Sequence, residues 1–151
     1  MARHILVSAC LLGLNTRYDG ENSLCTELLD RLKQQDLIPV PICPEQLVGL
    51  PTPRPKACSP DHAGQSPRSW RGHAINEEGQ TMDDLFIKGA QMSLQIATLT
   101  GCTQAILKQK SPSCGSHMIY RNGTLVSGQG VTAALLDKHS IHIDSEESFG
   151  N

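Results

Sequence analysis

Short β-prone runs alternate with helical patterns along this chain, and that alternation limits its fold more than any other feature. A strand, a helix and a second strand in succession are typical of a crossover connection, which makes the two strands parallel. The chain has 151 residues, a length that suits one hydrophobic core. The sequence therefore predicts a single α/β domain over residues 1–151, with a mostly parallel sheet flanked by helices in a Rossmann-like sandwich. The predicted strands cover residues 4–9, 37–42, 104–108 and 141–144, and the predicted helices cover residues 23–35, 81–100 and 131–139.

Two stretches depart from this alternation. Residues 44–79 are rich in proline and glycine and poor in apolar residues, so they predict irregular structure with one short strand near residues 70–75. Asn122 and Gly123 form a favoured two-residue turn, which predicts a small hairpin over residues 119–126.

The charge balance disfavours broad, sequence-tolerant binding of nucleic acids. The formal net charge is −2 and aromatic residues make up 3% of the chain. A uniform positive field for a nucleic-acid backbone is absent, and few rings are present to stack exposed bases. We therefore expect a small-molecule substrate, and we regard a folded tRNA as a possible but disfavoured partner.

The role expected of the cysteines depends on the cellular compartment. The N-terminal apolar run is too short for a signal peptide, and no later segment approaches the length of a membrane span. We therefore expect a cytoplasmic protein with no membrane association. In a reducing compartment the six cysteines are expected to bind metal or take part in catalysis rather than to form disulfides.

Three of the cysteines follow predicted strands. Cys10 and Cys43 come directly after the first two strands, and Cys114 lies in the loop after the third. Ligands of an open parallel sheet bind beyond the carboxyl ends of its strands, so these three side chains are expected to meet at one edge. The other three have different positions: Cys102 precedes its strand, Cys25 opens a helix, and Cys58 lies in the proline-rich stretch.

Three converging thiolates repel one another unless a metal neutralises them. Zinc and an iron–sulfur cluster both meet that need. The chain lacks the close cysteine pairs of zinc ribbons, and a cubane cluster suits ligands that arrive from three separate loops. The alternative is that each cysteine is simply a small buried apolar residue.

Four blocks around these cysteines resemble the signature sequences of the thiouracil desulfidase family. The resemblance runs from the first strand to the last helix. The blocks are VSACLLG at residues 7–13 with RYDG at 17–20, PICPEQLVGLPTPR at 41–54, LK at 107–108 with SPSCG at 111–115, and GQGVTAALL at 128–136.

The resemblance implies a cofactor and a reaction. It implies a [4Fe-4S] cluster held by Cys10, Cys43 and Cys114, with hydrolytic, non-redox removal of sulfur from thiouracil or a thiouridine nucleotide. By the same resemblance, Glu45 is the catalytic acidic residue and Ser111 the catalytic serine. The chain departs from the family after the Pro-Arg-Pro run, where Lys56, Ala57 and Cys58 replace a segment that more often carries an acidic residue.

Each role has an alternative interpretation. Glu45 is placed to activate water, and Ser111 to donate a proton near the ring nitrogen. Glu45 could instead be a solvated carboxylate or a partner of Arg54, and Ser111 a turn-capping hydroxyl. For the whole protein, the alternatives are a non-catalytic iron–sulfur or zinc protein and a thiol enzyme that uses Cys114 as its nucleophile.

Overall fold

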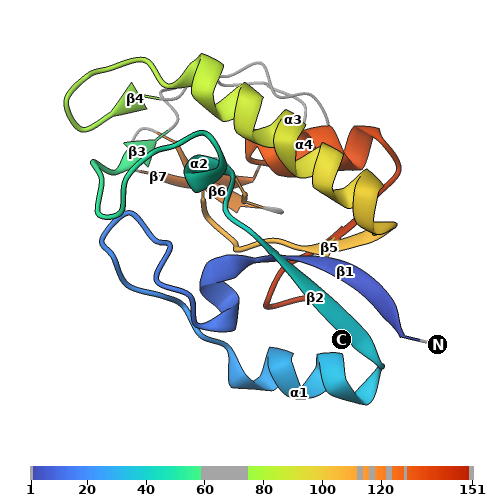
Figure 1. Cartoon of the computed structure of the whole chain (residues 1–151). Helices are drawn as coiled ribbons and strands as arrows, with labels where there is room; N and C mark the ends of the chain where they lie inside the picture. Colours follow the sequence, from blue (N-terminus) through green and yellow to red (C-terminus); the bar gives the residue numbers. More distant parts are fainter. Residues whose placement is uncertain are drawn as a thin grey trace.

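The fold is built on a four-stranded sheet in the order β2-β1-β5-β8, with every neighbouring pair parallel. The computed structural model describes residues 2–58, 75–111, 114–115, 118–121, 124–127 and 129–149. Helix α1 covers one face of the sheet, and α3 and α4 cover the other (Figure 1). The predicted α/β class with a parallel sheet is therefore confirmed. The strands are β1 (Arg3–Ser8), β2 (Leu37–Ile42), β5 (Gln104–Ile106) and β8 (His142–Asp144), and the helices are α1 (Thr26–Gln34), α3 (Asp83–Thr100) and α4 (Val131–Lys138).

The helices pack through apolar stripes with helical spacing. On α1, Leu28 and Leu32 are buried against the sheet, as expected for an amphipathic surface helix. On α3, Phe86, Ala90 and Ala97 form the buried stripe. Gly101 ends α3 with a φ of 71°, a left-handed conformation that glycine adopts without steric cost.

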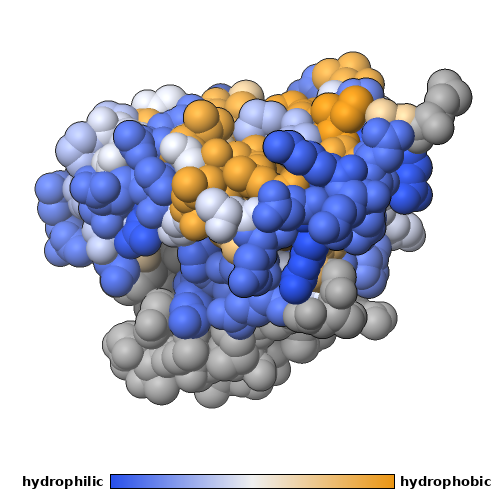
Figure 2. Space-filling model, turned by 90° about the horizontal axis from the view of Figure 1, so that it is seen from below, coloured by the Kyte–Doolittle hydropathy of each residue, from blue (hydrophilic) through white to orange (hydrophobic). Residues whose placement is uncertain are grey.

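Hydrophilic side chains dominate much of the surface on the α1 side, where they surround an apolar area (Figure 2). The hydrophilic part of this face is what an amphipathic helix leaves toward solvent when its apolar stripe faces the sheet. No helix in the described part of the chain is both long enough and apolar enough to cross a membrane.

The register of β1 and β2 determines where the functional loops lie. Ser8 is paired with Ile42, so the two strands end side by side. The residues that follow, Ala9 and Cys43, therefore emerge at the same edge of the sheet. β5 also runs parallel to β1, with Val7 paired with Ile106, so its following loop joins them.

Three local elements differ from the sequence prediction. The third predicted strand ends at Ile106 rather than at residue 108. The first predicted strand ends one residue early, because Ala9–Leu12 forms the 3₁₀ helix η1, which Gly13 closes at a φ of 92°. The predicted irregular stretch contains a short helix, α2 (Pro44–Leu47). Pro44 favours this turn because its fixed φ suits the first position of a helix.

The remaining strands form two small antiparallel sheets. β3 (Ala57–Cys58) pairs with β4 (Ile75–Asn76). β6 (Met118–Arg121) pairs with β7 (Thr124–Ser127), which confirms the predicted hairpin. Of the short strand predicted near residues 70–75, only Ile75 lies within the described residues, and it belongs to β4.

Candidate functional site

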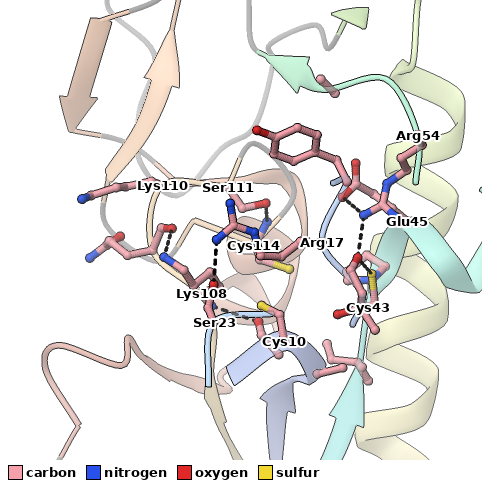
Figure 3. Close-up of a pocket in the computed structure, with 18 of the residues that line it drawn as sticks. Cys10, Arg17, Ser23, Cys43, Glu45, Arg54, Lys108, Lys110, Ser111 and Cys114 are labelled. Carbon is pink, nitrogen blue, oxygen red and sulfur yellow. Dashed lines mark hydrogen bonds and ion pairs between the residues drawn. The ribbon is translucent and has the colours of Figure 1, made fainter. Parts of the chain in front are cut away.

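A pocket of about 380 Å³ lies at the carboxyl edge of the central sheet. Residues from the loops after β1, β2 and β5 line it (Figure 3). The structure brings all five residues that the sequence singled out into this one pocket. They are Cys10, Cys43, Glu45, Ser111 and Cys114.

Cys10 lies on η1, directly beyond β1. It is 9% exposed, and burial raises the pKa of its thiol to about 11. Lys108 and Arg17 act in the opposite direction and lower the pKa, while the neighbouring Cys43 raises it. A thiol in this setting is protonated at neutral pH, and a bound metal replaces its proton.

Cys43 directly precedes α2, in extended backbone conformation. Burial raises the pKa of its thiol, and hydrogen bonds from the backbone N–H groups of Gln46 and Glu45 oppose that rise. The thiol also lies 3.8 Å from the carbonyl oxygen of Thr16. The amide donors at this helix end are suited to a thiolate, because they stabilise negative charge on the sulfur.

Cys114 lies in the loop after β5 and is 6% exposed. Its backbone N–H donates to the Ser111 hydroxyl at 3.2 Å, and the Gly115 N–H donates to the Ser111 carbonyl at 2.6 Å. Ser111 thus organises the turn that carries the third cysteine. The turn-capping role that the sequence allowed for Ser111 is present in the structure, where the hydroxyl oxygen acts as an acceptor.

The cysteine arrangement fits a group larger than one ion. The side chains of Cys10, Cys43 and Cys114 surround a shared pocket (Figure 3). Among the described residues, no three His, Cys, Asp or Glu side chains are close enough to hold a single metal ion. Three soft sulfur donors around a pocket of this size suit an iron–sulfur cluster.

Glu45 lies on α2 and its side chain is 16% exposed. Its Oε2 atom is 3.0 Å from Nη2 of Arg54, whose own side chain is 3% exposed. The partnership with Arg54 that the sequence raised as an alternative is therefore real. It does not remove Glu45 from the site, because both residues line the pocket.

A second ion pair organises the opposite side of the pocket. Nζ of Lys108 lies 2.9 Å from Oε2 of Glu146, and the backbone N–H of Gln109 donates to Oε1 of the same carboxylate at 2.9 Å. The backbone N–H of Lys108 donates to the Ser8 hydroxyl at 2.9 Å. The loop after β5 is therefore tied both to β1 and to the segment after β8.

Sequence reasoning missed Glu146. It lies two residues beyond the last strand, β8, so the strand-end rule that selected the cysteines would also have pointed to it. Arg17, from the RYDG block, lines the pocket, where its guanidinium donates to the Ser23 hydroxyl at 3.2 Å. Tyr18, from the same block, and Lys56, where the chain departs from the family pattern, also line the pocket.

Comparisons with known proteins agree with the resemblance seen in the sequence. The family model described as 2-thiouracil desulfurase matches residues 5–148. A solved structure, the [4Fe-4S]-dependent thiouracil desulfidase TudS, is 39% identical, with a TM-score of 0.79 over 96% of this chain and 91% of that chain. The Bacillus subtilis (strain 168) protein YbbK, described as uncharacterized, is 33% identical over 97% of this chain and 98% of its own length. With the predicted resemblance confirmed over nearly its whole length, this chain belongs to the 2-thiouracil desulfurase family.

Proposed function

We propose that this protein is an iron–sulfur-dependent desulfidase, which replaces the thiocarbonyl sulfur of thiouracil or a thiouridine nucleotide with oxygen from water. The products are the uracil compound and sulfide, and no electrons are gained or lost. The observation that carries the proposal is that three cysteines, a carboxylate and a serine from three strand ends line one pocket. Residues 1–151 act as one catalytic domain in this proposal.

Cys10, Cys43 and Cys114 are the proposed ligands of a [4Fe-4S] cluster. When bound through three cysteines, such a cluster supplies a thiophilic iron that can accept a sulfur ligand. Burial raises the pKa of both thiols, and the amide donors beside Cys43 and the cations near Cys10 partly offset that rise. These groups support the assignment because ligation requires the thiolate form.

Glu45 is the proposed base. Its carboxylate lines the pocket and is mostly shielded from solvent, so it can accept a proton from the water that attacks the ring carbon. The Ser111 hydroxyl lies in the same pocket. Its oxygen accepts the Cys114 N–H. A serine hydroxyl can donate as well as accept a hydrogen bond, and donation toward the ring nitrogen as the C–S bond breaks is the role proposed for Ser111.

The test is sulfide release by protein purified without oxygen. Iron and acid-labile sulfide are measured first, and sulfide and uracil are then measured after incubation with 2-thiouracil, 4-thiouracil and thiouridine monophosphates. We expect sulfide and the uracil compound in equal amounts. Iron-loaded protein that yields sulfide from none of these compounds would refute the enzyme and leave a non-catalytic metal protein.

Chelation separates the proposal from a thiol enzyme. A thiol enzyme that uses Cys114 as its nucleophile would still release sulfide after iron is removed. The proposed enzyme loses this activity on chelation and regains it when the cluster is reconstituted. A folded tRNA stays the less favoured substrate, since the net charge of −2 offers little attraction to a phosphate backbone. A cytoplasmic location is part of the proposal, because reducing conditions keep free thiols available for iron.

A further inference from the structure

We infer that Arg54 is the positioning residue that orients the Glu45 carboxylate for the reaction, an inference that rests on the proposed function. Nη2 of Arg54 lies 3.0 Å from Oε2 of Glu45. The side chains are 3% and 16% exposed respectively. A charge-assisted contact this well shielded holds its geometry far better than an exposed ion pair.

The guanidinium is itself fixed by other loops of the site. Nη2 also donates to the carbonyl oxygen of Thr16 at 2.9 Å, in the loop that follows Cys10. Nη1 donates to Thr52 Oγ1 at 3.1 Å and to the Pro51 carbonyl oxygen at 3.3 Å. The direction of the Glu45 side chain is therefore set by two loops outside its own short helix.

The main chain of Arg54 reinforces the same connection. Its backbone N–H donates to the Tyr18 carbonyl at 2.8 Å, and Nζ of Lys56 lies 5.6 Å from the centre of the Tyr18 ring. The loop after β1 and the turn after α2 are thus joined by both backbone and side chains. Arg54 sits at that junction, with its charge directed at Glu45.

The two oxygens of Glu45 have different roles in this arrangement. Oε2 is held by Arg54, and within the described residues Arg54 is the bonding partner of this side chain. Restricting rotation of the carboxylate leaves Oε1 as the oxygen that takes the proton from water. Such restriction matters because a misplacement of about 1 Å can lower a rate about 100-fold.

Only an arginine can make this set of contacts. Its two terminal nitrogens form four contacts, with Glu45, Thr16, Thr52 and Pro51. A lysine carries three donors on one atom and cannot span the same acceptors. Arg54→Lys therefore keeps the positive charge and removes the orientation, which makes it the informative substitution.

The experiment compares Arg54→Lys with the wild type in the iron-loaded protein. Iron content and the visible cluster absorbance report on the cluster, and kcat and KM are measured separately for 2-thiouracil. We expect unchanged iron, KM within about twofold, and kcat lowered by about 10- to 100-fold. Arg3→Lys, on an exposed arginine at the start of β1, is the matched control and is expected to leave kcat unchanged.

Glu45→Asp provides the readout that a merely structural role would not change. This variant keeps a carboxylate but shortens it by one methylene, which withdraws it from Arg54. If Arg54 acts through Glu45, Arg54→Lys adds little further loss in the Glu45→Asp background. If Arg54→Lys lowers kcat by the same factor in both backgrounds, the inference is overturned, because Arg54 then acts independently of the carboxylate.

The remaining outcomes are also decisive. Wild-type kcat in Arg54→Lys overturns the inference and leaves the proposed function intact, whereas an inactive wild type refutes both. If Arg54→Lys does not fold or bind iron, Thr52→Val is measured in the same two backgrounds. It removes an oxygen that accepts from both the Arg54 guanidinium and Gln46 Nε2, so it should lower kcat severalfold with Glu45 present and have little effect with Asp. No effect of Thr52→Val in either background would overturn the inference.

Discussion

A Cβ atom at Gly89 would lie 2.5 Å from the backbone carbonyl oxygen of Pro44. Gly89 is in the first half of α3, and Pro44 begins α2 between the proposed ligand Cys43 and the proposed base Glu45. The absence of a side chain at residue 89 lets α3 contact the backbone of this functional segment directly. The position of the segment is therefore set by helix packing as well as by β2.

Gly89→Ala is expected to destabilise the protein. Alanine in place of glycine ordinarily favours a helix by about 1 kcal/mol, but here the added methyl would overlap a backbone atom, and overpacking costs about 1–3 kcal/mol. We expect a lower free energy of unfolding in urea and a lower kcat, since Pro44 must shift. Gln91→Ala, at an exposed position on the same helix, is the control and should not reduce either quantity. Equal or greater stability of Gly89→Ala would contradict this packing argument.

Replacement of each proposed ligand is expected to remove the cluster. Cys10→Ser, Cys43→Ser and Cys114→Ser should each lower the iron content after anaerobic reconstitution, because soft thiolate donors are needed for an iron–sulfur cluster. The chain offers matched controls in Cys25 and Cys102, which do not line the pocket. Cys25→Ser and Cys102→Ala should retain full iron. Loss of iron in a control, or its retention in a ligand variant, would require a different ligand set.

Glu45→Gln is expected to separate cluster binding from catalysis. The substitution preserves the shape of the side chain and removes the carboxylate that accepts the proton. Iron content should match the wild type, while kcat should fall by about 100- to 10,000-fold, the usual contribution of general base catalysis. Glu27→Gln, on the exposed side of α1, is the control. Near-normal sulfide release by Glu45→Gln would assign the base to another residue.

Ser111→Ala tests two roles of one hydroxyl. The change removes the acceptor of the Cys114 N–H, so the apoprotein should lose about 1 kcal/mol of unfolding free energy. If the hydroxyl also donates a proton, kcat falls further than the iron content does. Ser111→Thr keeps the hydroxyl and should recover most of both quantities. If kcat falls only in proportion to the loss of iron, Ser111 stabilises the turn and does not donate a proton in the reaction.

The main elements and the location of the site could be predicted from the sequence because both depend on local patterns. The spacing of apolar residues predicted α1 and α3. The position of cysteines just after predicted strands singled out Cys10, Cys43 and Cys114. The short helix α2 was not predicted, since a single turn after a cysteine and a proline is too brief for periodicity to reveal. Glu146 was missed because the strand-end rule was applied to the cysteines and not to the last strand.

The sequence by itself determined the alternation of strands and helices, the sheet edge at which the cysteines gather, and the signature blocks of the family. Only the tertiary structure decided that Arg54 forms an ion pair with Glu45, that Lys108 forms one with Glu146, and that Pro44 packs against Gly89. The first set depends on periodicity and chain order, which are properties of neighbouring residues. The second set depends on how loops and helices distant in the sequence pack at one edge of the sheet, where burial selects which charges and backbones meet.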